Sequence, residues 1–431
     1  MDSYSSKNPA RENLAQATTS EWARLGQKLG PGLLFAASSV GTSHLVQSTR
    51  AGADYGLAMA GLILTACLVK YPAFRFGSDY AVATGQTLID SYFRQGRWAV
   101  VIYGIEVMVT MFIATAAVGL VTSGLVNNVL SLDLPATALT AVLLGLCAAV
   151  LISGRYQVFE KLTKGLVALF MLLILVAVAL SAPDLESGSL NPAPIFSGEK
   201  HTLLFMIALA GWMPTAVGAS VFQSLWVCAK SKALGRPLTK AEARFDFNLG
   251  YGVTVVLAMC FLIMGTVLMY QPQIVVSDSS TGFAAQLIGL FTQSIGAFAY
   301  PIIAVVAVAV MLSTLLTLID ACPRALGALA TQGGGNCEDN RYYTPLVVIQ
   351  CCGAMAVLLF FMSSFKTFID LATSVAFLTA PLLAFLNHRA VFSNEVAEEH
   401  RPGVAMKTWS QVGIVLMGMF GLYYLHFMVM G

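Results

Sequence analysis

Two stretches decide the fold of this chain: residues 37–44 read Ala-Ser-Ser-Val-Gly-Thr-Ser-His, and residues 210–220 read Ala-Gly-Trp-Met-Pro-Thr-Ala-Val-Gly-Ala-Ser. Both interrupt long apolar runs, and a Gln-Ser pair follows each, at 47–48 and 223–224. Pro214 cannot donate a helical hydrogen bond, and its ring clashes with the preceding turn. Glycine and hydroxyl side chains make local unwinding inexpensive. We therefore expect both apolar helices to be broken near their middle.

The rest of the sequence is typical of a membrane protein. Of its 431 residues, 57% are hydrophobic and 11% are charged, whereas soluble domains have roughly 25% charged residues. Apolar stretches of about 20 residues, enough to cross a bilayer, recur along almost the whole chain. We predict an all-α polytopic membrane protein with eleven transmembrane helices, at about 29–53, 57–78, 98–127, 134–154, 157–181, 201–227, 247–270, 294–320, 344–362, 366–388 and 409–430.

The distribution of basic residues predicts the orientation in the cell (inner) membrane. With a cytoplasmic N-terminus, all of the 24 Lys and Arg residues except Arg50, Lys200 and Lys366 fall on cytoplasmic segments or helix ends. Positive charge marks the cytoplasmic side, and an odd number of spans then places the C-terminus outside. The expected parts are a cytoplasmic tail (1–28), a ten-helix core (29–388), and a cytoplasmic loop with the eleventh helix (389–431).

Two short amphipathic segments, 87–98 and 281–291, precede the third and eighth spans. They fall at opposite faces of the membrane, five spans apart, and the two interruptions have the same offset, which predicts an inverted repeat of five plus five helices. Matched interruptions of this kind indicate a transporter's binding site, because freed backbone groups in lipid must line protein or a water-filled cavity. The alternative is that small residues allow close helix packing and that Pro214 only kinks its helix.

Four short motifs carry a family resemblance: Leu29-Gly30-Pro31-Gly32, Gly52-Ala53-Asp54-Tyr55-Gly56, Met213-Pro214 and Ala380-Pro381-Leu382-Leu383. Over the first ten helices the chain resembles the Nramp family of divalent-metal transporters. The resemblance implies the LeuT-like arrangement, five helices plus five inverted ones, with the cargo held where helices one and six unwind. It also implies secondary transport by alternating access, with one extra C-terminal helix here.

The chain departs from the family pattern at the site motifs. The family's Asp-Pro-Gly-Asn turn in helix one reads Gly-Thr-Ser-His at 41–44, and its Met-Pro-His in helix six reads Met-Pro-Thr at 213–215. The family's two proton-relay acids of helix three fall on Ile113 and Ala116. The usual acidic metal ligand and the proton-relay acids are therefore missing, and we expect the site to bind through neutral donors alone.

The expected cargo follows from the resemblance and is a small inorganic, divalent metal cation. The residues expected to bind it are Gly41, Thr42, Ser43, His44, Ala210, Met213, Thr215 and Ser220. His44 and Met213 together offer ligands for a softer transition metal. Two alternatives stay open. One is an anionic or zwitterionic small organic solute, which the N-terminal ends of half-helices favour, and the other is a non-transporting sensor on the same scaffold.

Ionisable groups inside a membrane are costly, so each is a candidate functional group. We expect gating or coupling roles for Arg50, Glu106, Gln47 and Gln223. The structural alternatives are that Glu106 pairs with Lys70, Arg75 or Lys161, and that Arg50 pairs with Asp54 one turn on. Asp370, near a span end, is expected to be solvated or capping. No enzyme motif, cofactor or nucleic-acid partner is expected; the partners are the cargo and the lipid bilayer, and the oligomeric state stays open.

Overall fold

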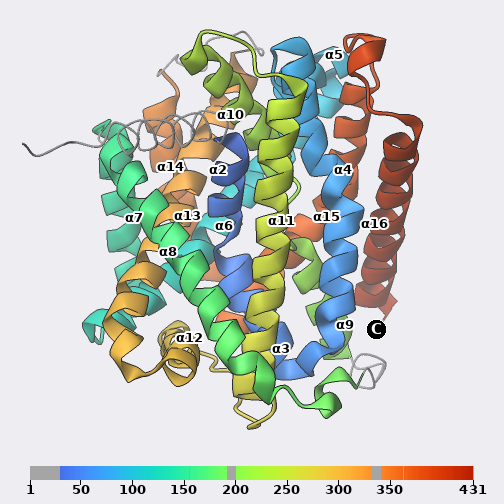
Figure 1. Cartoon of the computed structure of the whole chain (residues 1–431). Coiled ribbons are helices and arrows are strands. Elements are labelled where there is room, and N and C mark those ends of the chain that lie inside the picture. Colours follow the sequence, from blue (N-terminus) through green and yellow to red (C-terminus); the bar gives the residue numbers. More distant parts are fainter. Residues whose placement is uncertain (1–29, 155, 192–199, 332–340, 363, 431) are drawn as a thin grey trace, which may run out of the picture.

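The computed structural model describes residues 30–154, 156–191, 200–331, 341–362 and 364–430, so the predicted tail, 1–28, lies outside the described residues. Within these ranges the chain is a bundle of long helices (Figure 1). Eight helical stretches are long and apolar enough to cross a membrane, while α7 and α9 are shorter apolar helices. The all-α, multi-pass membrane fold is confirmed, and the number of eleven passes stays a prediction.

In chain order the helices are α2 (Pro31–Ser39), α3 (Thr49–Tyr55), α4 (Ala60–Thr84), α5 (Leu88–Gln95), α6 (Arg97–Leu130), α7 (Ala136–Ile152), α8 (Tyr156–Ser181), α9 (Lys200–Gly211), α10 (Ala219–Leu234), α11 (Lys240–Gly265), α12 (Ser280–Ile295), α13 (Tyr300–Ala330), α14 (Tyr343–Phe361), α15 (Phe365–Val391) and α16 (Val404–Met430).

The first and sixth expected spans are both broken, as predicted. In the first, α2 ends at Ser39, and a π-helical segment, Ser43–Ser48, leads into α3. In the sixth, α9 ends at Gly211 and α10 begins at Ala219, with residues 212–218 between them outside any helix. The interruption in the first span is narrower than the 37–44 stretch that the sequence suggested.

The two short amphipathic helices, α5 and α12, lie at opposite ends of the bundle (Figure 1). We call these ends the α5 end and the α12 end. The α5 helix begins with a capping box, in which the side chains of Thr87 and Asp90 each bond the other's backbone. This arrangement agrees with an inverted repeat, since each short helix directly precedes a long one, α6 or α13.

Helix α2 packs against α11 with backbone touching backbone. A Cβ atom on Gly32 would lie 2.0 Å from the carbonyl oxygen of Asp246, and one on Gly250 would lie 2.0 Å from that of Gly32. Only glycine fits at such an approach. The inner surface of α2 is therefore fixed against α11, which positions the broken part of the first span.

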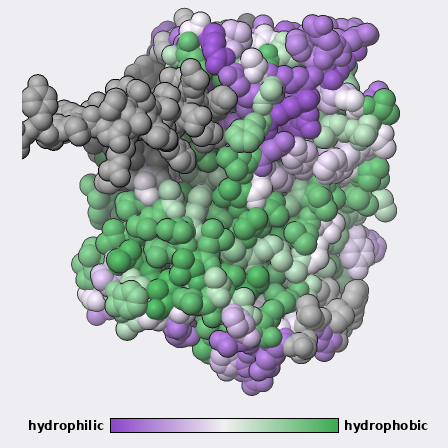
Figure 2. Space-filling model, viewed as in Figure 1, coloured by the Kyte–Doolittle hydropathy of each residue, from purple (hydrophilic) through white to green (hydrophobic). Residues whose placement is uncertain are grey.

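The outer surface separates into two zones (Figure 2). An apolar zone covers the middle of the visible face, and hydrophilic residues gather at the α5 end and, over a smaller area, at the opposite edge. Large hydrophobic side chains such as Leu68, Val142 and Leu422 are more than half exposed. A surface of this kind suits contact with lipid rather than water.

Candidate functional site

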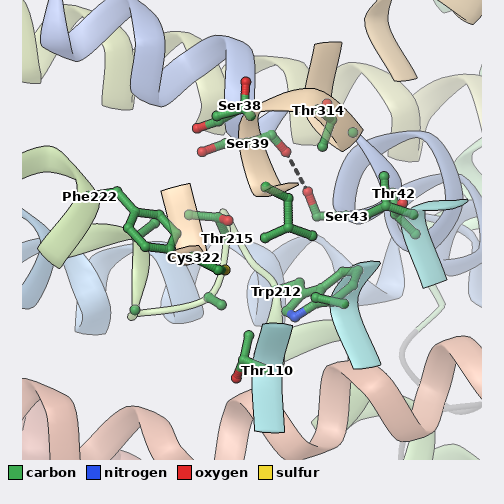
Figure 3. Close-up of a pocket in the computed structure, with 18 of the residues that line it drawn as sticks. Ser38, Ser39, Thr42, Ser43, Thr110, Trp212, Thr215, Phe222, Thr314 and Cys322 are labelled. Carbon is green, nitrogen blue, oxygen red and sulfur yellow. Dashed lines mark hydrogen bonds between the residues drawn. The ribbon is translucent and has the colours of Figure 1, made fainter. Parts of the chain in front are cut away.

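A cavity of about 90 Å³ lies where the two interrupted helices meet. The first interruption contributes its wall residues Ser38, Ser39, Gly41, Thr42 and Ser43, and the second contributes Trp212, Thr215, Ala216 and Gly218. Figure 3 shows Ser38, Ser39, Thr42 and Ser43 of the first stretch near Trp212 and Thr215 of the second, with the Ser43 hydroxyl donating to the Ser39 carbonyl oxygen. Because the backbone opens here, hydroxyl groups and an indole ring reach a space that straight helices would fill.

Helices α6 and α13 complete the wall. Helix α6 presents Tyr103, Glu106 and Thr110, and α13 presents Thr314 and Cys322. Sequence reasoning missed Tyr103 and Cys322 as wall residues, because each fits a helical apolar run as well as a site. Trp212 lies within the interruption that the sequence indicated, but it was not among the residues expected to bind the cargo. The signal that could have found Tyr103 is its position one turn before the buried acid Glu106 on the same face of α6.

Glu106 is 4% exposed and turns its carboxylate to the cavity. Its Oε1 accepts a hydrogen bond from Thr110 Oγ1 at 3.2 Å. A Cβ atom on Gly218 would lie 2.9 Å from the same oxygen, so the carboxylate rests against the second interruption. The cavity wall therefore holds one acid, which comes from the third span rather than the first, whereas the sequence led us to expect neutral donors alone.

The basic partners suggested for Glu106 are engaged elsewhere. Lys70 Nζ donates to the carbonyl oxygens of Ala210 and Gly211, and Arg75 Nε pairs with Asp79 Oδ2 at 3.0 Å. The side chain of Lys161 lies outside the described residues. In the part of the chain that the structure describes, no ion pair neutralises Glu106, so the cavity wall carries a negative charge whenever this group is ionised.

Three further wall atoms are buried without a hydrogen-bond partner within the described residues: Thr42 Oγ1, Tyr103 OH and Trp212 Nε1. An unsatisfied buried polar atom costs about 1–3 kcal/mol, so native structures hold few of them. All three belong to residues around one cavity, which leaves unpaired polar groups beside it. Two of these groups come from the interruptions and one, Tyr103, comes from α6.

His44 is not brought to the cavity. The ring is fully buried, with Nδ1 2.8 Å from Ser43 Oγ and 3.0 Å from the Ser39 carbonyl oxygen. Its Nε2 lies 2.9 Å from the carbonyl oxygen of Thr254 on α11. Both ring nitrogens are therefore occupied by protein groups, and the ring connects the first interruption to α11.

Of the other residues expected to bind the cargo, some line the cavity and some do not. Gly41, Thr42, Ser43 and Thr215 line the cavity, whereas Ala210, Met213 and Ser220 do not. The sulfur of Met213 accepts a hydrogen bond from Ser48 Oγ at 3.5 Å, and Asn387 Nδ2 donates to Ser220 Oγ at 2.8 Å. Across the described ranges, no cluster of three or more His, Cys, Asp or Glu side chains is placed to hold a metal ion. The suggested pair of metal ligands, His44 and Met213, gains no support from this geometry.

Arg50 has a partner that the sequence did not suggest. Its Nη1 lies 2.7 Å from Asp370 Oδ1 and its Nη2 lies 3.1 Å from Asp370 Oδ2, a bidentate ion pair between α3 and α15. Gln47 joins the pair, since its Nε2 donates to Asp370 Oδ1 and its Oε1 accepts from Arg50 Nη1. The suggested pairing of Arg50 with Asp54 is wrong, and so is the solvated or capping role for Asp370.

Gln223 is buried, and neither of its amide atoms has a partner among the residues described.

Comparison with known proteins places the chain in a family. The family model described as natural resistance-associated macrophage protein-like (Nramp) matches residues 32–426. An uncharacterized protein of Pasteurella multocida (strain Pm70) is 29% identical over 414 residues, which are 95% of this chain and 94% of that protein.

Solved structures share the fold at low sequence identity. The manganese transporter of Eremococcus coleocola, solved with an aromatic bis-isothiourea substituted compound, aligns with a TM-score of 0.62 at 13% identity, over 94% of this chain and 87% of that one. MhsT in complex with L-phenylalanine aligns with a TM-score of 0.60 at 16% identity, over 91% of this chain and 97% of that one. The fold is thus the LeuT-like one that the sequence predicted, and the family match over most of the chain shows that this protein belongs to the Nramp family.

Proposed function

We propose that this protein is a secondary transporter that moves a small inorganic cation, expected to be divalent, by alternating access around the cavity at the two interruptions. The observation that carries the proposal is the Glu106 carboxylate, which faces this cavity without a basic partner in the described part of the chain. A buried carboxylate attracts a cation strongly, because the low-dielectric surroundings screen its charge poorly. Membership of the Nramp family and the shared fold of a manganese transporter support a metal cation.

The ligands available in the cavity favour a hard cation that keeps part of its water. The side chains of Thr42 and Thr215 line the wall beside the single carboxylate, and so does Ser43, whose hydroxyl is bonded to the Ser39 carbonyl oxygen. Hard divalent cations prefer oxygen ligands and retain waters where protein oxygens are few. The soft donors suggested by the sequence, His44 and Met213, are bonded to other protein groups. A soft transition metal is accordingly a weaker candidate than a hydrated hard one.

A zwitterionic organic solute is the second candidate, and Trp212 favours it. The indole Nε1 can only donate a hydrogen bond, and it lies in the cavity wall without a protein partner among the described residues. A solute with both an ammonium and a carboxylate would satisfy Glu106 and Trp212 together. A purely anionic solute is disfavoured, because the Glu106 carboxylate would repel it.

Arg50, Asp370 and Gln47 form the proposed gate toward the α12 end. The Arg50 side chain is 1% exposed and the Asp370 side chain 22% exposed, so the pair separates the buried interior from the surface. Opening on that side requires α3 and α15 to part and this pair to break. With the α5 end assigned to the cytoplasm from its basic loops, the gate would face the outside. Glu106 and Gln223 keep their proposed coupling roles on the cytoplasmic half.

Uptake into proteoliposomes tests the proposal. Purified full-length protein is assayed with Mg²⁺, Mn²⁺ and Ca²⁺ against neutral amino acids and small carboxylates, beside Glu106→Gln. The control variant is Glu398→Gln, whose side chain is 93% exposed on the loop before α16. We expect cation uptake by the wild type and by the control, and a loss of at least tenfold in Glu106→Gln.

Three results would count against the proposal. Uptake of amino acids alone would favour the second candidate, and no uptake of any solute would favour a sensor. Cation uptake that is unchanged in Glu106→Gln would remove this carboxylate from the mechanism.

A further inference from the structure

Lys70, midway along α4, is buried inside the bundle with its ammonium group at the end of α9. Its Nζ lies 2.5 Å from the carbonyl oxygen of Ala210 and 2.7 Å from that of Gly211. The residue is 1% exposed. Helices α4 and α9 run beside each other (Figure 1). Within the described ranges, no carboxylate forms an ion pair with Lys70, so its charge is held by backbone carbonyls alone.

The buried Lys70 ammonium and the carbonyl groups at the end of α9 each supply the hydrogen-bond partner that the other needs. The last carbonyls of a helix have no partner within it and carry the negative end of the helix dipole. In lipid such groups must be satisfied by protein, and a lysine in the same region needs hydrogen-bond acceptors for its ammonium. The end of α9 at Gly211 and the ammonium of Lys70 satisfy both needs at once.

The position of this contact matters for cargo binding. Gly211 directly precedes Trp212, which lines the cavity, so the two carbonyls belong to the turn where the second interruption begins. Carbonyl oxygens at such an interruption are suitable ligands for a transported cation, and the sequence had suggested Ala210 for this purpose. In the structure a side-chain cation already holds them.

We propose that the Lys70 ammonium occupies the Ala210 and Gly211 carbonyl oxygens in place of a cargo cation and thereby determines cargo specificity. The inference rests on the proposed function, because it concerns how that same site selects a cation. Neither Ala210 nor Gly211 is among the residues that line the cavity, and while the ammonium is bound to their carbonyl oxygens a cargo ion cannot exchange its water for them. The ion is instead bound by Glu106, the hydroxyl groups and its own waters. Lys70 is thus a positioning residue, which acts on the cargo through the end of α9.

Calcium binding by calorimetry on the purified full-length protein tests this role. Lys70→Met keeps the approximate length of the side chain and removes its charge and its donors. Ca²⁺ is the probe because it prefers carbonyl and carboxylate oxygens and ignores the thioether that the variant introduces. We expect Lys70→Met to bind Ca²⁺ at least tenfold more tightly than the wild type, and Lys70→Arg, which keeps the charge, to bind it as the wild type does.

A double variant separates this inference from the proposed function. The new calcium position in Lys70→Met would use the α9 carbonyls, so most of its gain should persist in Lys70→Met/Glu106→Gln relative to Glu106→Gln alone. That result would support the role of Lys70 even if Glu106 proved irrelevant to transport. Equal calcium affinity in the wild type and Lys70→Met would overturn the inference, and so would an equal gain in Lys70→Arg.

If Lys70→Met cannot be purified in folded form, Lys70→Gln replaces it. The amide can donate to one or both carbonyls but carries no positive charge. We then expect a smaller gain in calcium affinity, about threefold or more, and the absence of any gain would overturn the inference in the same way.

Discussion

Asp246 Oδ2 lies 2.6 Å from the backbone nitrogen of Gly32, and Asp246 Oδ1 lies 3.0 Å from that of Gly30. A residue of α11 therefore caps the first turn of α2 from another helix. Helix α2 needs such a partner, because its own N-cap residue, Gly30, offers no side-chain acceptor and the first amide groups of a helix are unpaired.

Replacing this cap should loosen α2. Asp246→Ala removes both acceptors, and we expect a loss of about 2 kcal/mol, the upper range for deleting an N-cap. We also expect that a thiol reagent added on the side of the α5 end labels a cysteine introduced at Ser38 faster than without the Asp246 change. This experiment uses a background without the native cysteines. Ser364→Ala, which deletes the cap of α15 within its own segment, is the control and should lower the melting temperature without changing that labelling.

The Arg50–Asp370 pair predicts strong energetic coupling. Asp370→Asn leaves the buried Arg50 guanidinium without its counter-charge, a change that typically costs about 3–5 kcal/mol. Arg50→Met/Asp370→Asn should recover much of this loss, so a double-mutant cycle in thermal unfolding should give a coupling of about 2 kcal/mol or more. The more exposed pair of Arg324 and Asp320, at 2.8 Å, is the control and should couple by under about 1 kcal/mol. Equal coupling in the two pairs would contradict the buried gate.

Placing at position 41 the acid that the family resemblance implies should not create a metal site without a second change. A Cβ atom on Gly41 would lie 2.7 Å from Thr314 Cγ2 and 2.9 Å from Thr314 Oγ1. We expect Gly41→Asp alone to lower the melting temperature and to leave Mn²⁺ affinity unchanged, because the side chain has no room. Gly41→Asp/Thr314→Ala should bind Mn²⁺ at least tenfold more tightly than either single variant. Gly61→Ala, where nothing lies within 4 Å of the added Cβ atom, should not lower the melting temperature, because alanine is the better helix former.

His44 should prove structural. Its ring bonds the first interruption to the Thr254 carbonyl of α11, and His44→Ala would leave buried carbonyls unsatisfied at about 1–3 kcal/mol each. We expect a clear drop in the melting temperature and less than a twofold change in cargo affinity once the protein is folded. A tenfold loss of affinity with an unchanged melting temperature would instead make His44 a ligand.

Much of the fold could be predicted because bilayer crossing imposes a strong pattern on the sequence. Apolar length marks a span, and Pro214 with its neighbouring small residues marks the second interruption. Helix ends were less predictable: the eighth span was expected at 294–320 and α13 runs Tyr300–Ala330. Hydropathy does not report where a helix ends once it continues beyond the apolar region, because the end depends on local caps and on tertiary contacts.

The sequence by itself determined the membrane class, the two broken spans and the presence of an acid, Glu106, inside the third span. Only the tertiary structure decided which groups meet. Arg50 forms an ion pair with Asp370, 320 residues away, instead of with Asp54 one turn on. The Ala210 carbonyl oxygen, which the sequence suggested as a cargo ligand, accepts a hydrogen bond from Lys70. The physical reason is that local spacing fixes only which residues share a helix face, whereas the packing of whole helices decides which faces, and therefore which charges, come together.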